Sequence, residues 1–197
     1  TVLSRGLGDV YKRQGQSNVY HADIKGKVKK ITNGNHMLTM NDLVGSDAVA
    51  TWTDPSNPSD IISFSIDKPN KINRLTDVNK DIFYNVEFGE VEEITYKSVD
   101  EKYVQGWIVK PPNFDSNKKY PLVLRIHGGP HSMYHVGFNY NFQLHAAQDQ
   151  VVLYTNPRGS TGYGYDFANA IQNAYPGNDY DDIMYGVDEV ISRGYID

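Results

Sequence analysis

Paired glycines follow a short apolar run, and their type and spacing suit them to bind an anion. The run Leu122–Ile126 is followed by His127-Gly128-Gly129-Pro130-His131. Two adjacent glycines let backbone N–H groups approach a ligand closely, because no Cβ stands in the way. Gly128 and Gly129 are therefore candidates for an anion-stabilising turn. An ordinary strand-to-loop turn is the alternative.

A second apolar run also ends in a loop punctuated by glycines. Val151–Thr155 leads into Asn156–Gly164, which reads N-P-R-G-S-T-G-Y-G. Short runs rich in branched residues that stop at glycine predict buried strands. With a helical stretch between them, two such strands make a parallel βαβ unit, and ligands bind beyond the carboxyl ends of parallel strands. The two glycine loops are therefore predicted to share one rim of a sheet.

Three histidines near the first loop have a spacing that suggests a metal site only if the segment is helical. His127, His131 and His135 recur every four residues, which on a helix places three imidazoles on one face. Glycine and proline inside the span disfavour that helix. We therefore expect no metal site here.

Other residue types that could do acyl-transfer chemistry lack the required context. Neither Ser132 nor Ser160 lies in a G-x-S-x-G elbow, and that motif is absent from the sequence. Asp181, Asp182 and Asp188 are expected on the surface or in the first turn of a helix, where solvent and the helix dipole account for them. None of the five is predicted to be catalytic.

Three motifs together resemble one enzyme family. They are the H-G-G-P-H segment at 127–131, the N-P-R-G-S-T-G-Y-G segment at 156–164 and the D-Y-D-D-I-M-x-G-V-D segment at 179–188. In this order and spacing they resemble the prolyl oligopeptidase family of serine peptidases. Within it, the chain is most similar to the acylaminoacyl-peptidase and dipeptidyl-aminopeptidase branch, and the resemblance covers roughly residue 15 to the end.

The resemblance implies a function and a role for the glycine turn. The parent protein would be a serine peptidase, an exopeptidase or oligopeptidase, that hydrolyses short peptides admitted between a propeller and a catalytic domain through an acyl-enzyme. In the family, one oxyanion-hole donor is a backbone N–H that corresponds to Gly129, with Gly128 shaping the approach. The serine, acid and histidine of the triad would lie beyond Asp197. No cofactor is expected.

Several side chains near the two loops are candidates for lining a substrate cleft: His131, Arg158, Tyr134 and Tyr163. Arg158 has the alternative of bracing its loop against the sheet. The tyrosines have the alternative of filling a domain interface. For the parent as a whole, a carboxylesterase or lipase and a non-catalytic propeller-bearing binding module remain alternative functions.

The part of the chain before the two glycine loops and their strands is predicted to form short strands at even intervals. Predicted strands cover residues 19–24, 28–32, 37–44, 48–53 and 61–66, which suggests a sandwich or a propeller. The segment ending Lys30-Ile31-Thr32 is echoed by the one ending Arg74-Leu75-Thr76 at a period of about 43 residues, the length of one propeller blade. The repeat favours a propeller.

These signals divide the chain into four parts. Residues 1–14 are expected to be a non-native tail outside the fold, 15–80 the end of a β-propeller (part of a blade plus one blade), and 81–90 a linker. Residues 91–197 are predicted to be the N-terminal part of an α/β-hydrolase domain. It would begin with an antiparallel hairpin over residues 91–98 and 103–110. A parallel βαβ unit with strands at 122–126 and 151–155 would follow, and then helices at 165–174 and 179–193.

Composition excludes several classes of function. With 197 residues and 39% hydrophobic content the chain can build a globular core, and a net charge of -5 argues against a nucleic-acid partner. The absence of cysteine excludes disulfides, thiolate zinc sites and a cysteine nucleophile. No apolar stretch approaches the roughly 20 residues of a membrane span. We expect a soluble chain, cytoplasmic or periplasmic/secreted, with a peptide substrate and an undetermined oligomeric state.

Overall fold

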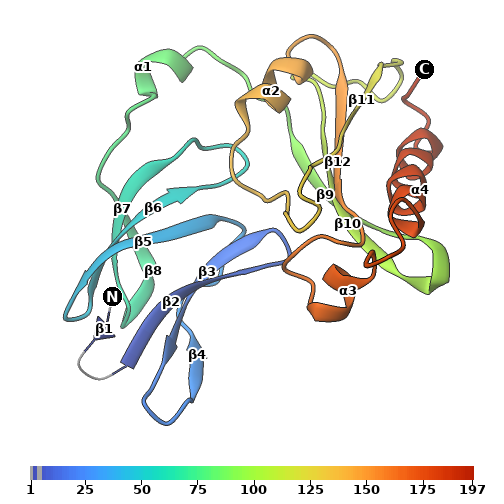
Figure 1. Ribbon diagram of the computed structural model, residues 1–197. Coiled ribbons are helices and arrows are strands. Elements are labelled where there is room, and N and C mark those ends of the chain that lie inside the picture. The colour runs from blue at the N-terminus through green and yellow to red at the C-terminus, as the bar shows by residue number, and fades with distance from the viewer. Residues whose placement is uncertain (1, 4–5) are drawn as a thin grey trace. The chain divides into compact units, whose positions relative to one another are not determined.

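The computed structural model describes residues 2–3 and 6–197, which form two compact units (Figure 1). One unit comprises the described residues up to Val86 together with His135–Phe138. The other comprises Glu87–Tyr134 and Asn139–Asp197.

The first unit is built on one sheet of short strands, and the short helix α1 (Lys80–Phe83) follows it. In sheet order the strands run β1-β2-β3-β5-β6-β7-β8, with β4 paired to β3. A single bridge, Ser17 to Met37, joins β3 to β5, whereas β5 to β8 are consecutive antiparallel neighbours. Four such strands are the pattern of one propeller blade. The strands are β1 (Val2–Leu3), β2 (Gly6–Arg13), β3 (Gln16–Ala22), β4 (Val28–Lys30), β5 (Met37–Val44), β6 (Asp47–Thr53), β7 (Asp60–Ser65) and β8 (Lys68–Arg74).

The sequence repeat corresponds to a repeated hydrogen-bond pattern. Thr32 Oγ1 accepts from Val19 N at 2.9 Å and donates to Asn18 Oδ1 at 3.1 Å. In the second copy, Thr76 Oγ1 accepts from Ile61 N at 2.9 Å and donates to Asp60 Oδ1 at 2.6 Å. The threonine that ends each copy therefore ties its strand to the start of an earlier strand in the same way.

Two segments of this unit differ from expectation. Residues 6–13, expected outside the fold, pair with β3 as strand β2. This pairing does not address the origin of the segment, so a non-native origin stays a prediction. Strand β8 was not predicted, because its sequence is polar and includes Pro69 and its side chains are mostly exposed. Proline is tolerated in such edge strands.

The second unit contains a four-stranded sheet in the order β11-β12-β10-β9. The predicted hairpin is confirmed as β9 (Val91–Lys97) and β10 (Tyr103–Val109), joined by the 3-10 turn η1 (Val99–Glu101). The predicted parallel pair is confirmed as β11 (Leu122–Arg125) and β12 (Val151–Asn156). Strand β12 also pairs antiparallel with β10, which places it inside the sheet.

Side chains along β12 point alternately to the two faces of this sheet, and a helix packs on each face. Val151 and Leu153 pack in the same core cluster as Val190 of α4 (Asn178–Ser192). On the other face, the Tyr154 ring lies 4.7 Å from the ring of Phe142 in α2 (Tyr140–Ala146). Figure 1 shows α4 as the long helix that ends near the C-terminus of the chain. The result is a three-layer arrangement that presents the strand ends at one rim.

The helix predictions differ in quality. Helix α4 was predicted to within a residue at each end, and Gly194 follows it with a φ of +84°. Helix α3 (Tyr165–Asn169) is shorter than the expected 165–174, because turns replace the helix and Asn173 adopts a φ of +59°.

Beyond α4 the chain returns to the sheet. Ile196 bridges Tyr120 in parallel, with Tyr120 N donating to Tyr195 O at 2.9 Å. Past this single bridge, the described residues place no strand on the side of β11 that faces away from β12. Strand β11 is therefore an edge strand here.

Candidate functional site

The turn after β11 has a geometry that only glycine accommodates easily. Gly129 has a φ of +134°, a region that L side chains rarely adopt. A Cβ added there would lie 3.1 Å from Ser132 Cβ, whereas one added at Gly128 would meet nothing within 4 Å. The backbone conformation therefore requires glycine at 129, while at 128 glycine leaves open space.

Both glycines present unused donors to solvent. Within residues 2–3 and 6–197, neither the Gly128 N–H nor the Gly129 N–H has a hydrogen-bond acceptor, and both residues are exposed. The turn borders a pocket of about 300 Å³. Most of its other lining residues are apolar, namely Ile126, Pro130, Pro157, Tyr175 and Ile183, and the polar residues His127, Arg158 and Asp179 complete the lining. Free N–H groups beside apolar walls suit an anion, because a low dielectric strengthens their hydrogen bonds.

His127 connects the glycine turn to the loop after β12. Its Nε2 lies 2.9 Å from Ser160 Oγ, and its Nδ1 lies 3.1 Å from Gly128 O. The ring of Tyr134 meets the imidazole edge-to-face, with 5.2 Å between centroids. A serine bonded to a histidine resembles a nucleophile with its base. However, Ser160 has no exposed surface, so this pair braces the two loops instead of attacking a substrate.

The two glycine loops lie at one rim of the sheet, as predicted. His131 Nδ1 is 3.1 Å from Gly159 O, and Thr161 N donates to Ser132 O at 2.9 Å. His131 is exposed beside the turn, and its role in lining a substrate cleft stays a prediction. The spacing of the loops on two parallel strands was a sufficient signal for this proximity.

Arg158 is not a free side chain of a cleft. Only 7% exposed, it donates through Nε and Nη2 to the two carboxylate oxygens of Asp182 at 2.9 and 2.7 Å. The backbone N–H of Arg158 also donates to Asp182 Oδ2, at 2.8 Å. These bonds raise the pKa of the guanidinium above its ordinary value. The alternative weighed in the sequence, that Arg158 braces its loop, is the one the structure supports.

Asp182 corrects a second expectation, since it is not on a helix surface. It has no exposed area and also accepts from Ser98 Oγ at 2.6 Å. Sequence reasoning missed this role because the partners, Arg158 and Ser98, lie in two other segments of the chain. The aspartates at the start of α4 show in the sequence that this end of the helix is acidic, but not that Asp182 is buried.

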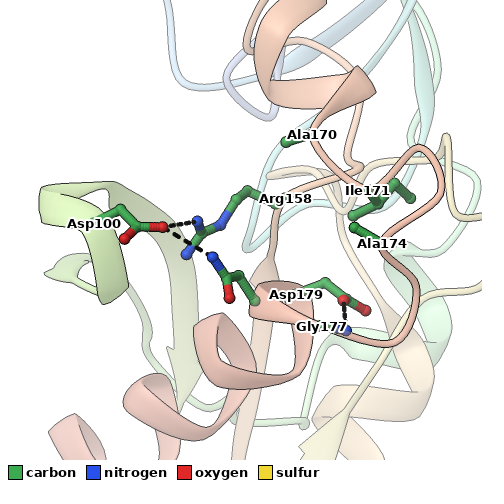
Figure 2. Close-up of a pocket in the computed structure, with 8 residues that line it drawn as sticks. Asp100, Arg158, Ala170, Ile171, Ala174, Gly177 and Asp179 are labelled. Atoms are coloured by element: carbon green, nitrogen blue, oxygen red, sulfur yellow. Dashed lines mark hydrogen bonds and ion pairs between the residues drawn. The ribbon is translucent and has the colours of Figure 1, made fainter.

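A second pocket, of about 320 Å³, lies on the outer side of Arg158 (Figure 2). The Asp100 carboxylate accepts from Arg158 Nη1 at 3.2 Å, a contact drawn in Figure 2, and from Asn178 Nδ2 at 2.9 Å. Asp179 accepts from Gly177 N at 2.7 Å across the same pocket. Arg158 and Asp100 thus form an ion pair in this pocket, and the Asp179 carboxylate is bonded to a backbone N–H.

Tyr134 and Tyr163 are fixed by a residue that sequence reasoning did not single out. Asn156, fully buried at the end of β12, accepts from Tyr134 N at 2.8 Å and donates to Tyr134 O at 3.0 Å. It also donates to Tyr163 Oη at 2.7 Å, and that hydroxyl donates to Gln105. Burial raises the pKa of Tyr163. The hydroxyl of Tyr163 is thus already hydrogen-bonded within the protein. The sequence signal that could have identified Asn156 is the Asn-Pro pair directly after a predicted strand.

Ring nitrogens of His127 and His131 contact the glycine loops, and His135 Nδ1 accepts from Gly137 N at 3.1 Å. Across residues 2–3 and 6–197, no three His, Asp or Glu side chains come together to hold a metal ion. The helices of that same part of the chain also lack the length and apolar character needed to cross a bilayer.

Comparisons with known proteins decide the family. The sequence model of the prolyl oligopeptidase family matches residues 136–197, which include the second and third motifs. An uncharacterized peptidase of Bacillus subtilis, YuxL, is 36% identical over 192 residues, covering 96% of this chain. The chain belongs to the prolyl oligopeptidase family. The resemblance carried by the three motifs is thus confirmed.

Other members of the prolyl oligopeptidase family match over the whole chain. Dipeptidyl-peptidase 5 of Porphyromonas gingivalis is 28% identical over 98% of it. The solved acylaminoacyl peptidase of Pyrococcus horikoshii superposes over 100% of it, with a TM-score of 0.87 and 27% identity. The chain spans 29% of each of the two curated relatives and 31% of the solved structure.

Proposed function

We propose that this chain is part of a serine peptidase that hydrolyses short peptides through an acyl-enzyme. The observation that carries the proposal is the exposed Gly129 N–H, free of any acceptor in the described residues and presented at the carboxyl end of a sheet strand. In acyl transfer the attacked carbonyl oxygen becomes negative, and a positioned N–H stabilises it. Several relatives carry the names of peptidases, which supports a peptide substrate.

We further propose that the second unit is the N-terminal part of an α/β-hydrolase domain. An antiparallel hairpin leads into a parallel pair, and helices lie on both faces of the sheet. The bridge between Tyr120 and Ile196 marks where a further parallel strand would begin beside β11. In this fold that strand leads to the nucleophile elbow. The first unit would be the end of a β-propeller, with the sequence repeat as support.

The catalytic roles divide between this chain and the rest of a longer protein. Gly129 N–H would be one oxyanion donor, Gly128 would leave room for the substrate, and His131 would line the substrate site. The nucleophile, acid, base and second donor are assigned to residues outside these 197, since the chain contains no G-x-S-x-G. A nucleophile and its base act as a unit. The chain alone is therefore expected to be inactive.

The test compares the 197-residue chain with a longer protein that contains it. A fluorophosphonate probe should label only the longer protein. Chromogenic dipeptidyl substrates and acylated amino-acid substrates should be cleaved only by the longer protein. Specific labelling of a serine in the short chain would contradict the assignment. Cleavage of simple esters without peptides would favour an esterase, and no labelling of the longer protein would favour a binding module.

A glycine pair tests the oxyanion role directly. In the longer protein, Gly129→Ala should lower kcat about 100-fold, the effect of losing one oxyanion donor, because the strained backbone would move its N–H. Gly128→Ala should lower kcat less, since an added Cβ meets no atom within 4 Å. Equal activity of Gly129→Ala and the wild type would contradict the assignment.

A further inference from the structure

We propose that His127 is a positioning residue that aims the Gly129 N–H, by fixing the peptide between Gly128 and Gly129. The inference rests on the proposed function, because it gives that N–H the role of an oxyanion donor. The inference assigns the orientation of the Gly129 N–H to one ring nitrogen of His127. It can therefore be tested separately from the proposed function.

The geometry of the peptide group carries the argument. His127 Nδ1 lies 3.1 Å from Gly128 O, which is the carbonyl of the same peptide unit that holds the Gly129 N–H. In a planar trans peptide the C=O and N–H point in opposite directions. A contact that fixes the carbonyl therefore fixes the direction of the N–H on the other side. Glycines are otherwise the residues with the greatest backbone freedom.

The proton positions on the imidazole follow from its partners. A carbonyl oxygen only accepts, so Nδ1 carries the proton and donates to Gly128 O. In the neutral ring Nε2 then accepts from the Ser160 hydroxyl, 2.9 Å away. If the ring is protonated, Nε2 donates and the hydroxyl accepts instead. The contact with Gly128 is the same in both charge states.

The far end of the ring is anchored to a rigid loop. Ser160 is completely buried, and its N–H donates to Pro157 O at 3.0 Å. The same loop is held by the Arg158 ion pair with Asp182, and Tyr134 packs against the edge of the imidazole. The ring therefore cannot turn without breaking a buried contact. A hydrogen bond on the carbonyl also polarises the peptide and strengthens its N–H as a donor.

The competing interpretation is that His127 merely pins one loop to the other through Ser160. The two interpretations assign importance to different ring nitrogens. An asparagine amide places its nitrogen where Nδ1 lies, one bond from Cγ, whereas a glutamine amide reaches toward the position of Nε2. His127→Asn thus retains the contact to Gly128, and His127→Gln retains the contact to Ser160.

The experiment measures kcat and KM of the longer protein on a chromogenic peptide. We expect His127→Gln and His127→Ala to lower kcat about 10- to 100-fold, a part or most of the effect of one oxyanion donor, with KM within about threefold. We expect His127→Asn to stay within about threefold of the wild-type kcat. His145→Asn is the matched control, because in the described part of the chain this ring has one hydrogen bond, from Nδ1 to Gln150 Oε1 at 2.8 Å, far in sequence from the two glycine loops.

Each outcome decides the inference. Equal loss in all three His127 variants, or better activity of His127→Gln than of His127→Asn, would overturn it. Should the His127 variants fail to fold, as shown by their thermal melts, Ser160→Ala replaces them. That variant frees the far end of the ring but leaves the Nδ1 contact to Gly128 O and the packing of Tyr134, so kcat should fall at most about tenfold, and a loss as large as that of Gly129→Ala would also overturn the inference. A wild-type protein without activity would instead refute the proposed function, and this inference with it.

Discussion

Strands β11 and β12 are parallel neighbours with similar apolar sequences, yet their burial differs completely. All six residues of β12 are buried, and none of the four residues of β11 is. Strand β12 lies between β11 and β10, while β11, among the described residues, has a strand on one side only. The comparison shows that position in the sheet, and not the apolar character of the run, determines how much of the strand is covered.

The loops that follow these strands differ in the same sense. The loop after β12 is held by a buried ion pair between Arg158 and Asp182. The loop after β11 keeps two N–H groups exposed and without an acceptor in the described residues. One strand end is therefore fixed by the protein itself, and the other is open to a ligand or to further chain. Four predictions test this difference.

The largest effect is expected from covering the open side of β11. A few hundred Å² of uncovered apolar surface costs on the order of 5 to 10 kcal/mol, which is comparable to the stability of a whole domain. We expect the isolated 197-residue chain to self-associate and to bind a hydrophobic dye. A longer protein that adds a strand beside β11 should melt sharply. A reversible two-state melt of the short chain as a monomer would contradict this.

The next largest effect concerns the ion pair at the end of β12. Asp182→Asn in the longer protein should lower the free energy of unfolding by about 3–5 kcal/mol, because it leaves the buried Arg158 charge with the exposed carboxylate of Asp100 as its remaining ion-pair partner. Urea unfolding measures the change. Asp188→Asn, at an exposed position of the same helix, should change it by less than about 0.5 kcal/mol.

A double variant sharpens this prediction. Replacing both partners, as in Arg158→Met with Asp182→Leu, should recover much of the loss, since no charge is then buried alone. A single Asp182→Asn variant as stable as the wild type would show that Asp100 alone satisfies the guanidinium.

A smaller effect distinguishes an edge from an inner strand. Leu153→Ala in β12 should cost about 3 kcal/mol, because Leu153 has no exposed surface. If a further strand covers β11 in the longer protein, Leu124→Ala should cost about the same. A cost near 1 kcal/mol at Leu124 would mean that β11 remains an edge strand there. Denaturant titrations of both variants give the comparison.

The smallest effect lies at the opposite edge of the sheet, where charges cover β9. Glu92 pairs with Arg193 at 2.5 Å and with Lys110 at 2.8 Å. Burial opposes its ionisation, but hydrogen bonds from Arg193 and Lys110 outweigh this and lower its pKa. A lowered pKa means that the stabilisation is present above the unfolded pKa of about 4.3 and is lost as the pH falls through the folded value.

Glu92→Gln tests this pH dependence. At pH 7 the variant should lose about 0.5–1 kcal/mol of stability. The difference from the wild type should begin to shrink as the pH falls below the unfolded pKa of about 4.3, and it should vanish once the pH is below the lowered folded pKa, where the folded carboxylate is protonated as well. A difference that stays constant between pH 7 and pH 3 would rule out the charge as its cause.

Local patterns made part of this architecture predictable. The hairpin β9–β10 and the parallel pair follow from alternation and from branched apolar runs that end in turn residues. The Thr32 and Thr76 repeat was visible as a sequence echo. Strand β8 was missed because an exposed edge strand needs no apolar residues.

Long-range polar contacts were the part that the sequence could not supply. The burial of Asp182 depends on Arg158 and Ser98, which lie on other elements. The role of Asn156 depends on two tyrosines that the fold brings to it. A charged or amide residue reads as exposed unless its partners are known. The rim that holds both glycine loops was predictable, whereas the contacts that stiffen it were not.

The bridge between Tyr120 and Ile196 has a consequence for synthesis on the ribosome. Parallel neighbours require a long crossover, so the segment that reaches β11 on its open side is made only after α2, β12, α3 and α4. At about 5–20 residues per second this interval is on the order of several seconds. During that time the backbone groups of β11 are available to strands of other nascent chains. The order of translation thus gives this strand a period of exposure that its neighbour β12, already paired with β10, does not share.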